Sequence, residues 1–267
     1  MPRITAAFAR ARAENRAALV VYLTAGDPDL PATARLIVAA AEAGADIVEV
    51  GVPFSDPTAD GVAIQRASER ALKRGTSMRG VLDAVREART RTECAVLLFG
   101  YYNPILAYGE ARLVDDAKAA GVDGFLVVDL PPEVCAPLRD PARAAGLDFV
   151  PLVAPTSTDA RIDAAAAVAS GFVYYVSLNG VTGAAAPDFA AASARALQVR
   201  ERSGLPVAVG FGVKTPDDVR QIAAHADGVV VGSAVVQQIE GAASADGAVA
   251  RVSALVAALA AATRRAA

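Results

Sequence analysis

The sequence predicts an α/β protein, a (β/α)₈ TIM barrel with an extra helix at its N-terminus. Short apolar runs recur along the chain, and stretches with amphipathic helical spacing separate them. The runs are almost continuously apolar, as parallel strands covered on both faces should be. Eight such units in roughly 250 residues match the barrel. A doubly wound open sheet is the alternative, but the loop 24–28 after the first strand lacks the dinucleotide-binding glycine pattern of that fold.

The elements follow one another in a regular order. A helix is expected over 4–15, where it would close the barrel floor, and helical spacing recurs over 31–43, 78–90 and 190–202. Six of the strands follow a glycine suited to ending a helix, namely Gly44, Gly121, Gly146, Gly171, Gly204 and Gly228. The expected strands are 18–23, 47–50, 95–99, 124–128, 149–153, 172–176, 207–210 and 229–232.

Composition narrows the class of protein. The chain has 267 residues, of which 54% are hydrophobic, and no linker or low-complexity boundary divides it, so 1–267 is expected to be a single domain. The formal net charge of −3, without basic runs, argues against a nucleic-acid surface or a polybasic membrane patch. No apolar signal core begins the sequence, and no apolar run approaches the ~20 residues that span a bilayer. Two scattered cysteines indicate a reduced, cytoplasmic protein.

Glu49 is the most informative residue. It lies near the end of the apolar run 47–50, and an ionised carboxylate inside a buried strand costs several kcal/mol or more unless it is paired. Glu49 is therefore paired, neutral or catalytic. Asp60 follows eleven residues later, after a loop that contains proline and glycine. It is a second candidate for a functional carboxylate, and the alternative is that it only caps the helix that starts near Val62.

In a barrel, the catalytic face lies at the carboxyl ends of the strands. Tyr22 lies at the end of the first strand, and the last three strands end in the glycine loops 179–183, 210–213 and 232–234. Backbone amides in such loops, with a helix N-terminus behind them, favour a phosphate group on the substrate.

The sequence lacks the residues that metal-dependent and Schiff-base catalysis require. The chain has one histidine, His225, and two cysteines, which is too few for a metal site of the usual kind, so no metal is expected. A Schiff base needs a lysine at a strand end, but Lys73 and Lys118 lie in expected helices, and Lys214 falls just past the turn 210–212, toward solvent or the loop rim. General acid–base chemistry by carboxylates, helped by tyrosine, remains.

The run from Val48 to Gly61 closely resembles the tryptophan synthase alpha subunit family. In the family this run is apolar-Glu-apolar-Gly-x-Pro-Phe-Ser-Asp-Pro-x-Ala-Asp-Gly. Further matches follow in order over almost the whole chain, at 24–28, 102–104, 129–131, 180–183, 210–212 and 232–233. The resemblance implies retro-aldol cleavage of indole-3-glycerol phosphate to indole and D-glyceraldehyde 3-phosphate, with no cofactor in this chain.

The resemblance also implies roles for individual residues. Glu49 matches the general acid–base residue, and Asp60 matches the carboxylate that holds the indole N–H. The substrate contacts it implies are Tyr22, Tyr174 and the loop threonine Thr182, and the phosphate cradle is Gly183, Gly212, Gly232 and Ser233. Tyr174 and its neighbour Tyr175 point to opposite faces of one strand, and Tyr174 is expected to face the interior.

The family's partner is a beta subunit that contains pyridoxal phosphate and receives the indole, usually in an α₂β₂ assembly. By analogy, the expected contact surface comprises 101–104, 129–132 and the segment after Asp56. Two other function classes stay open at this point. One is another metal-free isomerase acting on a phosphorylated sugar, and the other is a non-catalytic barrel that only activates a partner.

Overall fold

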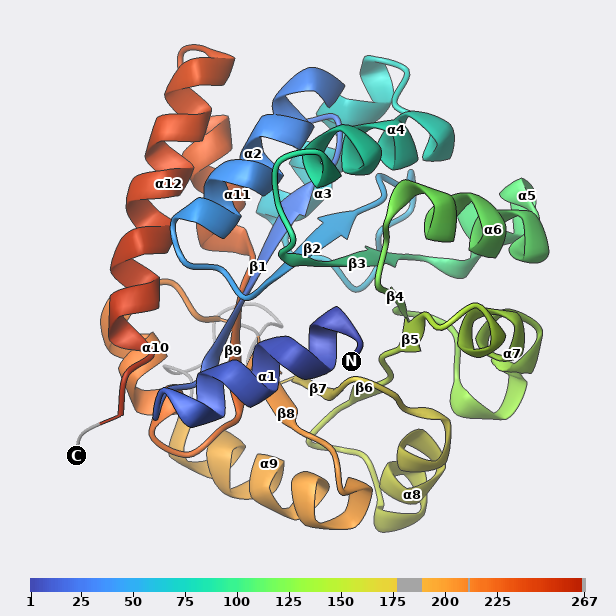
Figure 1. Cartoon of the computed structure of the whole chain (residues 1–267), viewed down its shortest axis with the longest axis vertical. Coiled ribbons are helices and arrows are strands. Elements are labelled where there is room, and N and C mark those ends of the chain that lie inside the picture. Colours follow the sequence, from blue (N-terminus) through green and yellow to red (C-terminus); the bar gives the residue numbers. More distant parts are fainter. Residues whose placement is uncertain (177–188, 211, 266–267) are drawn as a thin grey trace.

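The computed structural model describes residues 1–176, 189–210 and 212–265. Within these ranges, nine strands form one parallel sheet in the order β5-β4-β3-β2-β1-β9-β8-β7-β6. The sheet curls around a central axis with the helices outside it (Figure 1). The strands are β1 (Ala18–Thr24), β2 (Ile47–Gly51), β3 (Ala95–Gly100), β4 (Gly124–Val127), β5 (Asp148–Phe149), β6 (Leu152–Val153), β7 (Val173–Val176), β8 (Val207–Gly210) and β9 (Gly228–Val231).

The barrel closes through a broken strand. β5 and β6 stand at the two ends of the sheet order, yet they belong to the single run expected as strand 149–153. Between them, the Val150 amide donates to the Phe125 carbonyl at 2.9 Å, and Pro151 accepts from the Tyr174 amide at 3.1 Å. Pro151 has no N–H to donate to a ladder, which explains the break. The predicted barrel is confirmed, and the prediction of an unbroken fifth strand is corrected to two short pieces.

The expected helices are confirmed as α1, α2, α4 and α9, with bounds that differ by one or two residues. Two further helices, α3 and α5, follow β2 and β3 at the catalytic face. The helices are α1 (Arg3–Ala13), α2 (Leu30–Glu42), α3 (Val62–Lys73), α4 (Met78–Arg89), α5 (Tyr102–Tyr108), α6 (Glu110–Ala120), the 3₁₀ turn η1 (Pro132–Val134), α7 (Ala136–Ala144), α8 (Asp159–Val168), α9 (Phe189–Ser203), α10 (Pro216–Ala223), α11 (Ser233–Glu240) and α12 (Ala245–Ala262).

Alternate residues of each strand supply two separate cores. Val20, Ile47 and Leu97 face the barrel interior, whereas Val21 and Val48 pack outward against the helices. This alternation follows from the two-residue period of a strand. Because register pairs Val20 with Ile47 and Tyr22 with Glu49, the side chains of Tyr22 and Glu49 point inward from neighbouring strands, nearer the catalytic face.

Helix α1 closes the floor, as the sequence predicts, and Figure 1 shows it lying across that end of the barrel. Ile4 and Phe8 are buried in the interior core, and the Phe8 and Phe172 rings have centroids 5.3 Å apart. The N-terminal helix thus plugs the end of the barrel opposite the loops that follow the strands.

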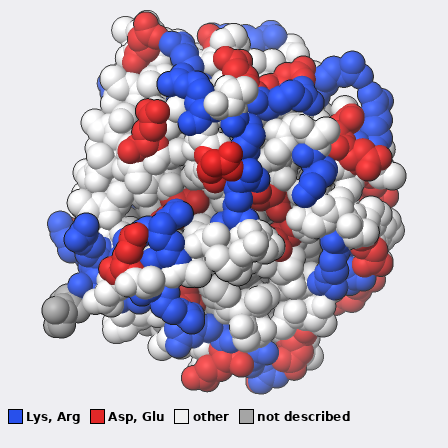
Figure 2. Space-filling view, in the orientation of Figure 1, with Lys and Arg blue, Asp and Glu red and all other residues white. Residues whose placement is uncertain are grey.

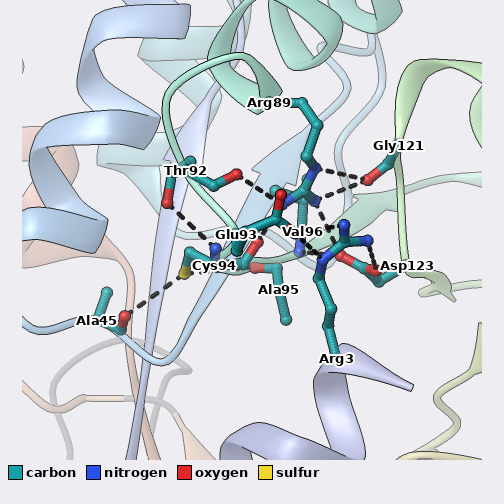
Figure 3. A network of polar contacts seen from close by, with 10 residues as sticks. All are labelled: Arg3, Ala45, Arg89, Thr92, Glu93, Cys94, Ala95, Val96, Gly121 and Asp123. Carbon is teal, nitrogen blue, oxygen red and sulfur yellow. Dashed lines mark hydrogen bonds and ion pairs between the residues drawn. The ribbon is translucent and has the colours of Figure 1, made fainter. Parts of the chain in front are cut away.

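Polar contacts fasten this floor (Figure 3). The Arg3 guanidinium of α1 donates to Asp123 at 3.1 Å and to Glu93 at 2.8 Å. Arg89, at the end of α4, donates to the Gly121 carbonyl at 2.7 Å and to the Asp123 carboxylate at 2.9 Å. Asp123 therefore joins the N-terminal helix to the connection that leads into β4.

Charges of both signs are interspersed on the face shown in Figure 2, without a large patch of one sign. Among the described helices, only α12 is long and apolar enough to cross a membrane by length and composition. Its Val252, Val256 and Leu259 side chains are fully buried in the outer core. α12 packs on α2, α10 and α11 as part of the outer ring of helices.

Candidate active site

Glu49 lies inside the barrel near the carboxyl end of β2. Its register partners are Tyr22 on β1 and Leu97 on β3, and it is 1% exposed. Its Oε1 atom has no hydrogen-bond partner among the residues that the structure describes. Burial raises the pKa of Glu49 to about 8. The structure therefore argues against the paired alternative for Glu49, and a neutral carboxyl group at this pKa remains compatible with a catalytic role as a proton donor.

Asp60 lies in the connection between β2 and α3, where its amide donates to the Pro57 carbonyl at 3.0 Å. Burial raises the pKa of Asp60 to about 6, and a hydrogen bond from the Tyr101 hydroxyl opposes this rise. The same hydroxyl accepts from the Ala59 amide at 3.0 Å. Tyr101, at the end of β3, therefore holds both the carboxyl group of Asp60 and the backbone just before it.

Tyr22 and Tyr174 both lie close enough to the two carboxyl groups to interact with their charges. Burial raises the pKa of each hydroxyl, and the charges of Glu49 and Asp60 raise both further. One site therefore contains all four side chains. Tyr174 belongs to the interior core and Tyr175 to the outer core, which confirms the predicted orientation of this strand.

Two glycines make room for the tyrosine hydroxyls. A Cβ atom on Gly51 would lie 2.1 Å from the Tyr22 hydroxyl oxygen, and one on Gly210 would lie 2.2 Å from that of Tyr174. Separations this short are impossible for real atoms. Gly51 and Gly210 thus leave room for the hydroxyl ends of the two rings, which reach over from the neighbouring strands β1 and β7.

Helix α3 covers this face of the barrel. Ala63 and Ala67 are buried with Tyr22 and with Val236 of α11. The edge of the Tyr22 ring meets the Phe99 ring, with centroids 5.2 Å apart. The helix begins directly after Asp60 and Gly61, so its position fixes where the Asp60 backbone enters the site.

The residues predicted to bind the phosphate lie beside those predicted to be catalytic. Gly232 precedes α11 and Ser233 is its first residue, so the first amides of α11 have no partner within the helix. Gly212 has φ of +76°, a conformation that glycine adopts readily. Ser233 Oγ lies 3.7 Å from the Cβ position of Gly61, beside Asp60. Thr182 and Gly183 lie outside the described residues.

The contact between Tyr101 and Asp60 is not expected from the sequence, where Tyr101 belongs to the expected contact surface 101–104. The two residues are far apart in the sequence, and only barrel closure brings the β3 end beside the loop after β2. Within the described part of the chain, no cluster of three or more His, Cys, Asp or Glu side chains could hold a metal ion.

A cavity of about 300 Å³ opens beside the site rather than within it. It lies between the end of β2, the start of α4 and helix α5. None of the predicted site residues lines it. Its lining residues are Val52, Pro53, Thr76, Ser77, Met78, Pro104, Ala107 and Tyr108.

Comparisons with known proteins agree with this geometry. A family model described as tryptophan synthase alpha chain matches residues 8–264. The tryptophan synthase alpha chain of Geobacter sulfurreducens is 55% identical over 240 residues, which is 90% of this chain and 91% of the relative.

Solved structures are similar over almost the full length. Tryptophan synthase from M. tuberculosis, in its aminoacrylate-bound form, is 38% identical with a TM-score of 0.88, covering 99% of this chain and 100% of the other. Tryptophan synthase subunit alpha from Legionella pneumophila is 38% identical with a TM-score of 0.91, covering 98% of each chain. Because the family model spans most of the sequence and the Geobacter relative is similar over nine-tenths of it, this chain belongs to the tryptophan synthase alpha chain family.

Proposed function

We propose that this chain cleaves indole-3-glycerol phosphate to indole and D-glyceraldehyde 3-phosphate, with Glu49 and Asp60 as its catalytic carboxyl groups. Family membership supports a lyase of tryptophan biosynthesis. The observation that supports the chemistry best is that two carboxyl groups share one site, with pKa values of about 8 and about 6. Two carboxyl groups whose pKa values lie on either side of 7 can act as one proton donor and one anion at neutral pH.

Glu49 supplies the proton. At pH 7 it is mostly protonated, and it donates to C3 of the indole ring, which turns the ring into an electron sink. The resulting Glu49 carboxylate then takes the proton of the side-chain hydroxyl next to C3. The C–C bond breaks, its electron pair returns to the ring, and the hydroxyl carbon becomes the aldehyde. Glu49 ends protonated, so the cycle balances.

Asp60 supplies the negative charge. It is mostly ionised at pH 7, so it accepts a hydrogen bond from the indole N–H and stabilises the cation formed when C3 is protonated. The Tyr101 hydroxyl donates to the same carboxyl group and favours its ionised form. A charge held ready in a buried site stabilises the transition state without having to reorganise.

The remaining predicted contacts hold the substrate. Tyr22 and Tyr174 present aromatic surface beside both carboxyl groups, which suits packing against indole. The amides of Gly212, Gly232 and Ser233, with the helix N-terminus of α11, suit the phosphate. We assign Thr182 and Gly183 to the loop that closes over Asp60 and to the phosphate cradle by the family resemblance.

A beta subunit is the proposed partner, in an α₂β₂ assembly, with pyridoxal phosphate in that subunit and no cofactor in this chain. The support is a set of exposed apolar side chains on connections at the catalytic face. Val62 at the start of α3 is 65% exposed, and Leu106 of α5 and Val134 of η1 are each 56% exposed. Exposed apolar groups gathered on one face favour a protein contact. We also propose a cytoplasmic location, supported by two free thiols, Cys94 and Cys135.

The test is to incubate the purified chain with indole-3-glycerol phosphate and follow free indole by its absorbance. Wild-type chain should release indole, and Glu49→Gln or Asp60→Asn should lower the rate by orders of magnitude while binding of a phosphate ligand survives. An isomerase would change the substrate without releasing indole. A barrel that only activates its partner would leave the substrate intact, and either result would refute the proposal.

A further inference from the structure

Arg70 joins three segments of the catalytic face. Its Nε and Nη2 atoms donate to the two carboxylate oxygens of Asp27, at 3.0 and 2.7 Å. Its Nη1 atom donates to Glu240 at 2.9 Å. Arg70 therefore makes a two-pronged contact with the loop after β1 and a third contact with the end of α11.

Each of these segments contains a residue predicted to touch the substrate. The strand β1 that leads to Asp27 contains Tyr22, helix α3 starts just after Asp60, and helix α11 begins at Ser233. A single guanidinium group thus links the proposed ring, acid and phosphate contacts.

The contacts of Arg70 matter for the position of α3 because the rest of the helix packs mainly through small side chains. The buried side chains of the helix are all small, namely Ala63, Ala67, Ser68 and Ala71, and the larger Ile64 packs beside them only partly buried. Small side chains give few interlocking contacts to fix the rotation or sliding of a helix. By contrast, the Asp27 side chain is only 3% exposed, and a planar guanidinium that binds both carboxylate oxygens sets direction as well as distance.

We infer that Arg70 is a positioning residue for the cleavage: its contact with Asp27 fixes α3 over the barrel and thereby sets the Asp60 carboxyl group relative to Glu49. This inference rests on the proposed function for its kinetic consequences. Arg70 acts through α3 and needs no contact with the substrate.

Arg66 offers a matched control on the same helix. It binds Glu240 through two hydrogen bonds of 2.9 Å each, whereas the hydrogen bonds to the Asp27 carboxylate come from Arg70. Arg66→Gln therefore removes an arginine from α3 and a contact with α11, but leaves the contact between Arg70 and Asp27 in place.

The kinetic experiment measures kcat and KM for indole release by Arg70→Gln, Asp27→Asn, the double variant, Arg70→Lys and Arg66→Gln. We expect Arg70→Gln and Asp27→Asn each to lower kcat by about 10- to 100-fold, the scale of a misplacement near 1 Å, with a smaller change in KM. The double variant should be no slower than either single one. Arg70→Lys keeps the charge but cannot bind both carboxylate oxygens, so its kcat should lie between those of wild type and Arg70→Gln. The kcat of Arg66→Gln should stay within about twofold of wild type.

A second measurement does not depend on activity. Nuclear magnetic resonance titration of the Asp60 carboxyl group should show its pKa falling from about 6 toward the ordinary range in Arg70→Gln, because a displaced α3 admits water. Among the described residues, the titratable groups that interact with Asp60 are Tyr101, Tyr22 and Tyr174, and Arg66→Gln changes none of them.

The outcomes separate the two claims. If every variant keeps the wild-type kcat and Asp60 pKa while Arg70→Gln merely unfolds at lower temperature, Arg70 is only structural and the inference is overturned. If the wild-type chain releases no indole but Arg70→Gln still shifts Asp60, the proposed function fails and the positioning role stands.

Discussion

The hydroxyl oxygen of Tyr22 lies 2.1 Å from the point where a Cβ atom on Gly51 would stand. The hydroxyl also lies 3.3 Å from Thr24 Oγ1, which holds the ring in this place. Gly51 follows Glu49 by two residues on the same strand. The absence of a side chain at Gly51 is therefore what lets an aromatic ring lie beside the buried acid.

Replacing Gly51 with alanine should displace the Tyr22 ring. We expect kcat/KM to fall about 100-fold, and stability to fall by about 1–3 kcal/mol, because overpacking forces side chains off their preferred conformations. Steady-state kinetics and urea unfolding measure the two effects. Gly100→Ala is the control at the end of the next strand, since its Cβ would meet Val52 Cβ at an ordinary 3.4 Å. Equal losses in both variants would show that the Tyr22 contact is not the cause.

The pH profile of kcat/KM should be bell-shaped. Asp60 must be ionised and Glu49 protonated, so activity should rise through the Asp60 pKa of about 6 and fall through the Glu49 pKa of about 8. Tyr101→Phe removes a hydrogen bond that lowers the pKa of Asp60, so the acid limb should move to higher pH. Tyr102→Phe is the control, because that hydroxyl binds Glu110 at 2.7 Å instead. An acid limb that stays put in Tyr101→Phe would contradict the assignment.

Glu49 should cost stability at high pH. Burial raises the pKa of Glu49 in the folded chain above its value in the unfolded chain. Its contribution to the free energy of unfolding is therefore full below the unfolded pKa and is lost as pH rises toward about 8. Glu49→Gln should therefore be more stable than wild type at pH 9, by a few kcal/mol, and the difference should shrink toward pH 4. Denaturant unfolding across this range gives the answer.

Glu93 is the control for this measurement. Its pKa is lowered by the hydrogen bond from Arg3, so Glu93→Gln should give no gain at high pH. A Glu49→Gln variant that is less stable than wild type at pH 9 would mean that the ionised carboxylate has a partner after all.

The floor network should matter for stability and not for catalysis. Arg89→Met leaves the Gly121 and Cys94 carbonyls and the Asp123 carboxylate without this donor, which should cost about 3–5 kcal/mol. Arg86→Ala, one turn earlier on the same helix, removes an exposed pair and should cost less than about 1 kcal/mol. Thermal unfolding measures both. A fall in kcat for folded Arg89→Met would contradict a purely structural role for the floor.

The periodicity of the sequence predicts the barrel well because glycines mark the helix ends and the strands are almost continuously apolar. It does not predict the break at Pro151, although the missing N–H of that residue is visible in the sequence. The apolar run 149–153 continues through Pro151, and hydrophobicity alone does not show where the hydrogen bonds between neighbouring strands are interrupted.

At the site, the run from Val48 to Gly61 leads to the prediction of Glu49 and Asp60 as catalytic residues, because its pattern closely resembles that of one family. The contacts of Asp60 with Tyr101, and of Arg70 with Asp27, join residues far apart in the chain. Such contacts depend on how the strands close into a barrel and how α3 lies across it. No local pattern in the sequence reports either arrangement.

The most direct test of the central claim compares indole formation by the wild-type chain and by Glu49→Gln at pH 7, with substrate saturating. If Glu49 is the proton donor, wild-type chain forms indole and the variant is slower by about 10²- to 10⁴-fold, the usual contribution of a general acid or base. A folded Glu49→Gln chain that forms indole at the wild-type rate would contradict the account.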